Sequence, residues 1–253
     1  MGIGNKVEIT RRICSVIFML DTSGSMSGAP IGAVNAAVEG ILPELESMNG
    51  DNPDVKIRIG ILTFDSGVKW VTGEKELVDP ASYTWKDLNA FGGTSMGAGF
   101  KKLNEALSVT SGIMNHATGS VAPVLFLLSD GEPTDNYRES LRVLQENNWY
   151  KVAGRVAIGY GESNDDVLRE FTGNPETVLH SNDPVELKNL IQFVTITSSM
   201  VASKGRKTTG TDGQTGKPGQ EPENPDDTTN AVASALKTAP PGLSTTTDPD
   251  EKW

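Results

Sequence analysis

Apolar and polar residues are grouped along the chain in blocks that predict buried strands separated by amphipathic helices. Four apolar runs have the length and the β-branched content of buried strands, at residues 13–20, 55–64, 121–128 and 152–159. Between and after them, apolar residues recur at helical spacing over residues 30–48, 97–109, 136–148, 167–171 and 184–196. We therefore expect an α/β fold in which a doubly wound, mostly parallel, Rossmann-like sheet carries helices on both faces.

One strand is expected to run against the others. Residues 68–72 follow the second apolar run after the short turn Asp65-Ser66-Gly67, which is typical of a hairpin partner. This segment predicts an antiparallel strand at one edge of the sheet.

The composition changes at residue 203. Residues 203–253 are rich in threonine, proline, glycine and acidic residues, and their only aromatic side chain is that of Trp253. Such a segment buries too little apolar surface to offset the entropy cost of ordering. The pattern predicts a folded domain over residues 1–202 and a disordered tail over 203–253, in which residues 231–236 form no more than a transient helical turn.

Charge and cysteine content narrow the function classes. The formal net charge of −11 and the sequence pI of about 4.7 argue against binding to nucleic acid. The single cysteine, Cys14, lies inside the first apolar run, which excludes an internal disulfide and predicts a buried thiol. No apolar stretch approaches the ~20 residues of a membrane-spanning helix. We expect a cytoplasmic protein that does not insert into membranes and is monomeric when free.

Oxygen-bearing side chains directly follow two of the predicted strands. Asp21, Ser23 and Ser25 come at spacing i, i+2 and i+4 after the first apolar run. Asp130 follows the third run, and a glycine-rich segment presents Thr94 just before a predicted helix. Because open α/β sheets bind ligands outside the carboxyl ends of their strands, we expect these side chains to meet at one sheet edge.

Three hydroxyls and two carboxylates form an oxygen-rich set of ligands with little negative charge. Such a set suits Mg²⁺, suits Mn²⁺ or Ca²⁺ less well, and does not suit a soft metal. The cation would stay electrophilic and could accept one more oxygen, such as a carboxylate of a partner protein. Taken singly, these residues are also typical helix caps or turn residues, but the five positions together favour a metal site.

The five positions resemble, in order and in strand–loop context, the metal-ion-dependent adhesion site of von Willebrand factor A domains. The resemblance covers roughly residues 8–200 and rests on three motifs: Asp21-x-Ser23-x-Ser25, Thr94, and Ser129-Asp130-Gly131. It implies that the three hydroxyl residues coordinate the cation directly and that the two aspartates act directly or through water. It also implies a metal-dependent protein-binding module that catalyses no reaction.

Within that family, three segments are similar to tellurium-resistance-associated proteins of the TerY type. The segments are residues 18–26, 92–97 and 128–135. Proteins of that type are encoded beside a serine/threonine kinase and a PP2C-type phosphatase. The resemblance implies a scaffold or adaptor in a bacterial stress or tellurium-resistance-type phospho-signalling system, with that kinase and phosphatase as partners.

Several residues beside the expected site are candidates for a rim that contacts the partner. They are Met26, Asp65, Ser95, Met96 and Glu132. The default interpretation of the two methionines is core packing, and the alternative is an exposed, adaptable contact. The polar candidates have solvated surface positions as their ordinary alternative.

An enzymatic alternative takes Ser95 as a nucleophile. Residues 93–97 match the G-x-S-x-G pattern of hydrolase nucleophile elbows, and Asp165 and His180 follow in the matching chain order. However, the segment before Ser95 is short and polar, whereas an elbow follows a buried central strand. A serine hydrolase would also leave Asp21 unexplained, so we expect no catalytic activity.

Two hypotheses concern the tail. Some of its threonines are candidate phosphoacceptors, each gaining about −1.5 to −2 charges on phosphorylation: Thr208, Thr209, Thr245, Thr246 and Thr247. The alternative is that they are solvating spacers. Acidic residues of the tail are a second source of a carboxylate for the metal, which would make the tail autoinhibitory.

Overall fold

The computed structural model describes residues 11–73, 76–114, 119–161, 163–204 and 227–239. Its sheet has six strands in the order β3-β2-β1-β4-β5-β6. The strands are β1 (Arg12–Asp21), β2 (Val55–Phe64), β3 (Val68–Trp70), β4 (Val124–Ser129), β5 (Gly154–Gly159) and β6 (Val178–His180). All neighbouring strands are parallel except β2 and β3, so the predicted α/β fold with one antiparallel edge strand is confirmed.

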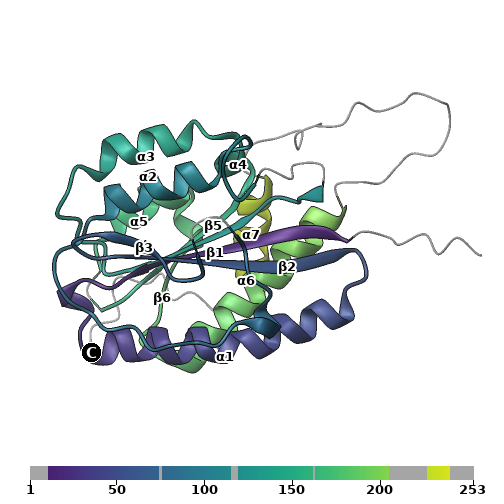
Figure 1. Cartoon of the computed structure of the whole chain (residues 1–253), viewed down its shortest axis with the longest axis horizontal. Helices are drawn as coiled ribbons and strands as arrows, with labels where there is room; N and C mark the ends of the chain where they lie inside the picture. The colour runs from purple at the N-terminus through teal and green to yellow at the C-terminus, as the bar shows by residue number, and fades with distance from the viewer. Residues whose placement is uncertain (1–10, 74–75, 115–118, 162, 205–226, 240–253) are drawn as a thin grey trace, which may run out of the picture.

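Helices cover both faces of this sheet (Figure 1). They are α1 (Ala29–Asp51), α2 (Met96–Ala106), α3 (Tyr137–Gln145), α4 (Asn148–Val152), α5 (Asp165–Thr172), α6 (Pro184–Lys204) and α7 (Asp227–Lys237). In the described part of the chain, short 3₁₀ turns in the connections are η1 (Gly24–Met26), η2 (Pro80–Ser82) and η4 (Pro175–Thr177). Among the described residues, no helix is long and apolar enough to cross a membrane.

The hydrophobic core has two halves, one on each face of the sheet. Alternate side chains of β1 divide between them, with Phe18 packing in the half covered by α1, α6 and α7 and Met19 in the half covered by α2, α3, α4 and α5. Phe18 stacks on Phe126 of β4 with ring centroids 5.3 Å apart. Because both faces are buried, β1 is apolar at consecutive positions, which explains the unbroken apolar run in the sequence. Cys14 is fully buried in this core, and burial raises the pKa of its thiol to about 12.

Element bounds differ from the sequence prediction where single residues interrupt a pattern. The predicted strand at 121–128 begins only at Val124, since Pro123 has no N–H to donate to a strand ladder. The predicted helix at 136–148 is two helices, because the Asn147 side chain accepts hydrogen bonds from Trp149 N (2.9 Å) and Tyr150 N (3.4 Å) and caps α4. Strand β6 has only three residues and was not predicted.

The C-terminal region differs most from expectation. The predicted domain end at residue 202 falls inside α6, and α7 is an eleven-residue helix where only a transient turn over 231–236 was expected. Val232 and Leu236 of α7 are 0% and 3% exposed and belong to the core half that contains α1 and α6. The expectation was wrong because the apolar stripe of this helix is stabilised by packing on the domain, and its local sequence does not reveal that surface. The remainder of the predicted tail lies outside the described residues.

Candidate metal site

Three loops at the carboxyl edge of the sheet carry the five predicted ligands. Asp21 is the last residue of β1, and Asp130 directly follows Ser129, the last residue of β4. Strands β1 and β4 are parallel neighbours with Leu20 opposite Leu128, so the two aspartates leave the sheet side by side. The loop that presents Thr94 precedes α2 at this edge. We call these the first (21–27), second (91–95) and third (129–135) loops.

Asp21 is fully buried and its carboxylate is held by neutral donors. Its Oδ1 accepts a hydrogen bond from Ser23 N at 2.8 Å, and its Oδ2 accepts one from Ser129 Oγ at 2.6 Å. The Ser129 hydroxyl in turn accepts a hydrogen bond from Gly131 N at 2.9 Å, which fixes its orientation. Asp21 therefore has one carboxylate geometry, set jointly by the first and third loops.

The hydroxyls of the first loop lie together. Ser23 Oγ and Ser25 Oγ are 3.1 Å apart, with Ser23 buried and Ser25 exposed. Turn η1 brings them close, because it folds residues 24–26 back on the end of β1. Two hydroxyl oxygens beside a carboxylate, one of them open to solvent, are an arrangement that suits a hard cation.

The second loop is bonded to the first at its Phe91 end. Phe91 N donates to Thr22 O at 2.9 Å, and Gly24 N donates to Gly92 O at 3.0 Å. Gly92 has a φ of +79°, and a Cβ there would lie 2.5 Å from Ser66 Oγ, so only glycine fits this close crossing.

The second loop is also bonded to the third. Thr94 N donates to Thr134 Oγ1 at 3.0 Å, and Thr134 N donates to Thr94 O at 2.9 Å. Asp135 accepts from Gly97 N and Ala98 N, at 2.9 and 3.0 Å, and so caps the start of α2. Each of the three loops is therefore hydrogen-bonded to the other two, which fixes the backbone segments that carry the five predicted ligands.

The electrostatics of this edge fit a cation. Burial raises the pKa of Asp21 above its ordinary value of 3.8, hydrogen bonds from Ser129 and Ser23 oppose that rise, and the nearby Asp130 charge adds to it. Within the described part of the chain, no group of three or more His, Cys, Asp or Glu side chains could hold a metal ion. A site here must therefore depend on hydroxyl oxygens as well as on the two aspartates. The buried Asp21 charge, stabilised only by neutral donors, is the feature that a divalent ion would complement.

The predicted rim is partly wrong. Met26 and Met96 are 1% and 0% exposed, because their side chains point into the core and anchor the loops from below. Neither can contact a partner. Glu132 is exposed, whereas Asp65 and Ser95 are half-buried.

The hydrolase alternative is not supported by the geometry. Asp165 and His180 do form a pair, with His180 Nε2 and Asp165 Oδ1 2.7 Å apart. Ser95, however, is held by its backbone N–H on Asp65 O, just after β2, at 2.7 Å. His180 ends β6, and β1, β4 and β5 lie between β2 and β6 at roughly 4.8 Å per strand. The three side chains are therefore not brought together as a triad.

Ser129 and Asp135 support the site through hydrogen bonds, and the sequence had given Ser129 only as part of the Ser129-Asp130-Gly131 motif. Thr134 is a supporting residue that sequence reasoning did not identify. Ser66, whose hydroxyl accepts from Gly93 N at 2.8 Å, is another. The predicted phosphoacceptor threonines 208, 209 and 245–247 lie outside the described residues.

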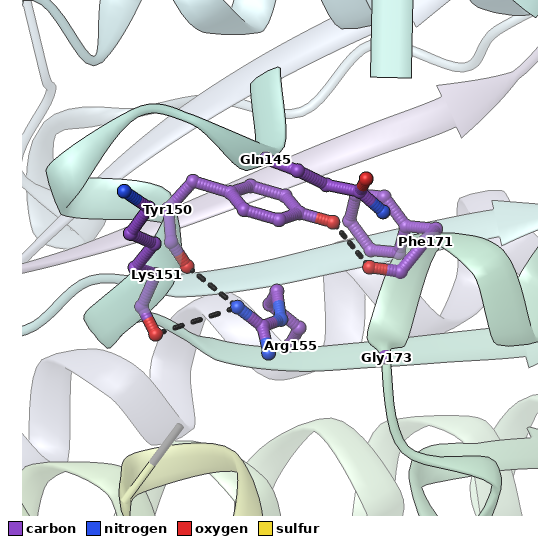
Figure 2. A pocket seen from close by; sticks show the side chains of 6 residues that line it. All are labelled: Gln145, Tyr150, Lys151, Arg155, Phe171 and Gly173. Carbon is purple, nitrogen blue, oxygen red and sulfur yellow. Dashed lines mark hydrogen bonds between the residues drawn. The ribbon is translucent and has the colours of Figure 1, made fainter. Parts of the chain in front are cut away.

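A separate cavity of about 210 Å³ lies at the amino-terminal end of β5, away from the three loops (Figure 2). Its lining residues are Gln145, Tyr150, Lys151, Arg155, Phe171 and Gly173. The Arg155 guanidinium is buried and donates to the carbonyl oxygens of Tyr150 (2.8 Å), Lys151 (3.4 Å) and Thr172 (2.9 Å), which end α4 and α5. The Tyr150 hydroxyl donates to Phe171 O. These polar groups satisfy carbonyl groups at the ends of α4 and α5, so the polar residues that line the cavity have a structural role.

Replacing Arg155 with methionine is expected to lower the free energy of unfolding by about 3 kcal/mol. The substitution removes the donor of several buried carbonyl groups, and each buried group left unsatisfied costs about 1–3 kcal/mol. Urea unfolding measures the effect. Arg142→Met is the control, because that arginine is 67% exposed in its ion pair with Glu146 and its loss should leave the midpoint unchanged. Equal urea midpoints for the two variants would contradict the structural role of Arg155.

Comparison with known proteins agrees with this architecture. The family model of the von Willebrand factor type A domain matches residues 15–193. An uncharacterized protein of Synechocystis sp. is 29% identical over 184 residues, which is 66% of this chain and 39% of that protein. The chain thus spans about two fifths of the length of this relative.

Solved structures show the same fold at low sequence identity. A von Willebrand factor type A protein from Catenulispora acidiphila superposes with a TM-score of 0.53 at 18% identity, over 74% of this chain and 42% of that one. The ArnB paralog VWA2 from Sulfolobus acidocaldarius gives 0.52 at 20% identity, over 71% and 44%. Proximal thread matrix protein 1 from the mussel byssus, with a zinc-occupied MIDAS motif, gives 0.53 at 18% identity, over 73% and 48%.

Proposed function

Since the chain belongs to the von Willebrand factor type A family, we propose that it is a divalent-metal-dependent protein-binding module. In this proposal the cation is held by Asp21, Ser23, Ser25, Thr94 and Asp130 and takes an acidic side chain of a protein partner. The observation that supports the proposal is the mutual hydrogen bonding of the three loops, which keeps together the backbone segments that carry these five residues.

The chemistry of the ligands supports Mg²⁺ as the resident ion, with Mn²⁺ or Ca²⁺ as alternatives. Hydroxyl and carboxylate oxygens are hard ligands, and the site offers no thiolate or imidazole among the five. The two aspartates carry the only negative charges among the five side chains, and the three hydroxyl ligands are neutral. The zinc reported in the mussel byssus protein supports a divalent ion in this type of site.

A binding role has more support than a catalytic one. Von Willebrand factor type A domains are generally interaction modules without catalytic activity. The five positions also include no histidine to act as the general base of a metal-assisted hydrolysis.

The pathway and the place of action are further parts of the proposal. A cytoplasmic scaffold in a bacterial stress or tellurium-resistance-type phospho-signalling system, beside a serine/threonine kinase and a PP2C-type phosphatase, is supported by three sequence segments. These are residues 18–26, 92–97 and 128–135. Co-purification with kinase and phosphatase encoded beside this chain would test it.

Retention of a partner on the immobilised chain tests the proposed function. We expect a protein of the source organism to be retained in Mg²⁺, released by EDTA, and not retained by Thr94→Ala. The hydrogen bonds of Thr94 described above use its backbone, so the alanine variant keeps the loop contacts. Thr110→Ala, which removes an exposed threonine hydroxyl beyond the C-terminal end of α2 and outside the three loops, is the control and should behave like the wild type. Retention that survives both EDTA and Thr94→Ala would refute the metal bridge.

A further inference from the structure

Phe91 is an exposed aromatic residue in the second loop of the candidate metal site. Its side chain is 61% exposed. The other large exposed hydrophobic residues of the described chain are Val109, Val143, Val185 and Met200, which are all aliphatic and lie outside the three loops. A phenyl ring gains more from burial than most side chains, so an exposed one beside a binding site marks a contact surface.

The backbone of Phe91 is fixed on both sides. Its own N–H donates to Thr22 O at 2.9 Å, and the next carbonyl, Gly92 O, accepts from Gly24 N at 3.0 Å. The preceding carbonyl, Ala90 O, accepts from Ser27 Oγ at 3.2 Å. The exposure of the ring therefore follows from the hydrogen bonds between the second loop and the first. Because the backbone is already fixed, a partner would contact this ring at little entropic cost.

The exposed residues of the first and third loops differ in charge, and the half-buried Asp65 carboxylate lies beside the first loop, where it accepts a hydrogen bond from Thr22 Oγ1 at 3.4 Å. At its Phe91 end the second loop contacts the first loop, whose exposed residues Ser25 and Ser27 carry no charge. At its Thr94 end it contacts the third loop, which contains Asp130 and the exposed Glu132. The exposed Glu132 therefore disfavours an apolar group of a partner at the Thr94 end, and the exposed ring of Phe91 favours one at the other end.

We propose that Phe91 is a specificity-determining contact: it packs against a bulky apolar side chain that lies within a few residues of the partner's acidic residue. The inference rests on the proposed metal-dependent function and names the partner's chemistry, an acidic residue next to an aromatic or large aliphatic one. The metal binds the acid, and Phe91 selects among acidic segments by what flanks the acid.

Selection from a peptide library tests this proposal. The probe is a phage-displayed library of linear peptides with a fixed central Asp or Glu and randomised flanks, selected on the full chain in Mg²⁺. We expect enrichment of large apolar residues within three positions of the acid. Phe91→Ser should lose this enrichment, keep binding of the acid in Mg²⁺, and weaken the best selected peptide by at least tenfold. Val143→Ser, which changes an exposed apolar residue of α3, is the control and should select the same peptides as the wild type.

The outcomes separate this inference from the proposed function. Apolar flanks that are equally enriched on wild type and Phe91→Ser, or acid enrichment without any apolar preference, would overturn the role of Phe91 while metal-dependent binding stands. If no selected peptide needs Mg²⁺, the proposed function fails and this inference fails with it. Light scattering gives a further check: a wild-type dimer that Phe91→Ser converts to a monomer would make a second copy the occupant of this surface, and would also overturn the proposal.

Discussion

Replacing Asp21 with asparagine is expected to abolish Mg²⁺ binding while leaving the metal-free protein at least as stable as the wild type. The affinity for Mg²⁺ should fall by more than roughly 100-fold, since loss of an outer-shell partner alone costs about 10–100-fold in metal sites. The wild type at 100 times its Kd for Mg²⁺ gains about 2.7 kcal/mol. At about 2–4 °C per kcal/mol for a chain of this size, its Tm rises by roughly 5–10 °C, and that of Asp21→Asn does not.

The stability of the metal-free variant follows from the pKa of Asp21. Burial raises this pKa above 3.8, so the folded state holds the proton more tightly than the unfolded state does. Protonation therefore stabilises the fold fully below pH 3.8, and this contribution is lost as the pH rises through the folded-state pKa. At neutral pH the buried charge carries a cost that asparagine does not, and a bound cation offsets that cost in the wild type.

Thermal unfolding at pH 7 in EDTA and in Mg²⁺ measures both effects. Asp54→Asn is the matched control, because it removes an exposed carboxylate just before β2, at the opposite edge of the sheet. It should keep the Mg²⁺-dependent rise in Tm. An Asp21→Asn variant that is still stabilised by Mg²⁺ would show that the ion binds elsewhere.

Ending the chain after Lys204, which removes α7, is expected to lower the free energy of unfolding by about 3 kcal/mol. Val232 and Leu236 are buried against the domain, and burial of one such side chain is worth about 1.5–3 kcal/mol before the cost of ordering the helix. Loss of this packing exposes apolar surface of α6 as well. The corresponding fall in Tm is about 6–12 °C.

Helix α7 also satisfies the backbone of β5. Strand β6 pairs only with Ala157–Gly159, so the start of β5 has no strand on that side. There, Arg155 N donates to Thr229 Oγ1 at 3.2 Å, and the Thr229 hydroxyl donates to Ala153 O at 2.8 Å. Truncation leaves both backbone groups to water at the edge of the sheet, which adds to the loss of packing.

A chain that ends after Ala239 is the matched control for this truncation. It keeps all of α7 and removes only residues 240–253, so its urea midpoint should equal that of the full chain. Thr229→Val is a smaller test of the same contact, and it should lower the midpoint by part of the truncation effect. Equal stability of the chains ending at Lys204 and Ala239 would mean that α7 contributes nothing to the fold.

The sequence by itself determined the layered architecture and predicted five candidate ligand positions. An apolar run that is buried on both faces shows no alternation, and this alone distinguishes a covered parallel sheet from an exposed one. The ends of such runs mark one sheet edge, so Asp21 and Asp130 could be assigned to a common site without coordinates. Hydroxyl-rich composition at that edge then predicted a site for a hard divalent cation.

Tertiary structure alone decided which neighbouring side chains face outward and which support the site. Met26 and Met96 lie within two residues of the candidate ligands Ser25 and Thr94, yet both are core residues, because short turns reverse side-chain direction in a way that periodicity cannot describe. Phe91 is the converse case, an apolar residue held in solvent by backbone hydrogen bonds to Thr22. Helix α7 needed the domain surface to become stable. Each of these outcomes depends on contacts between residues far apart in the chain, and the free energy of such contacts is absent from any local pattern.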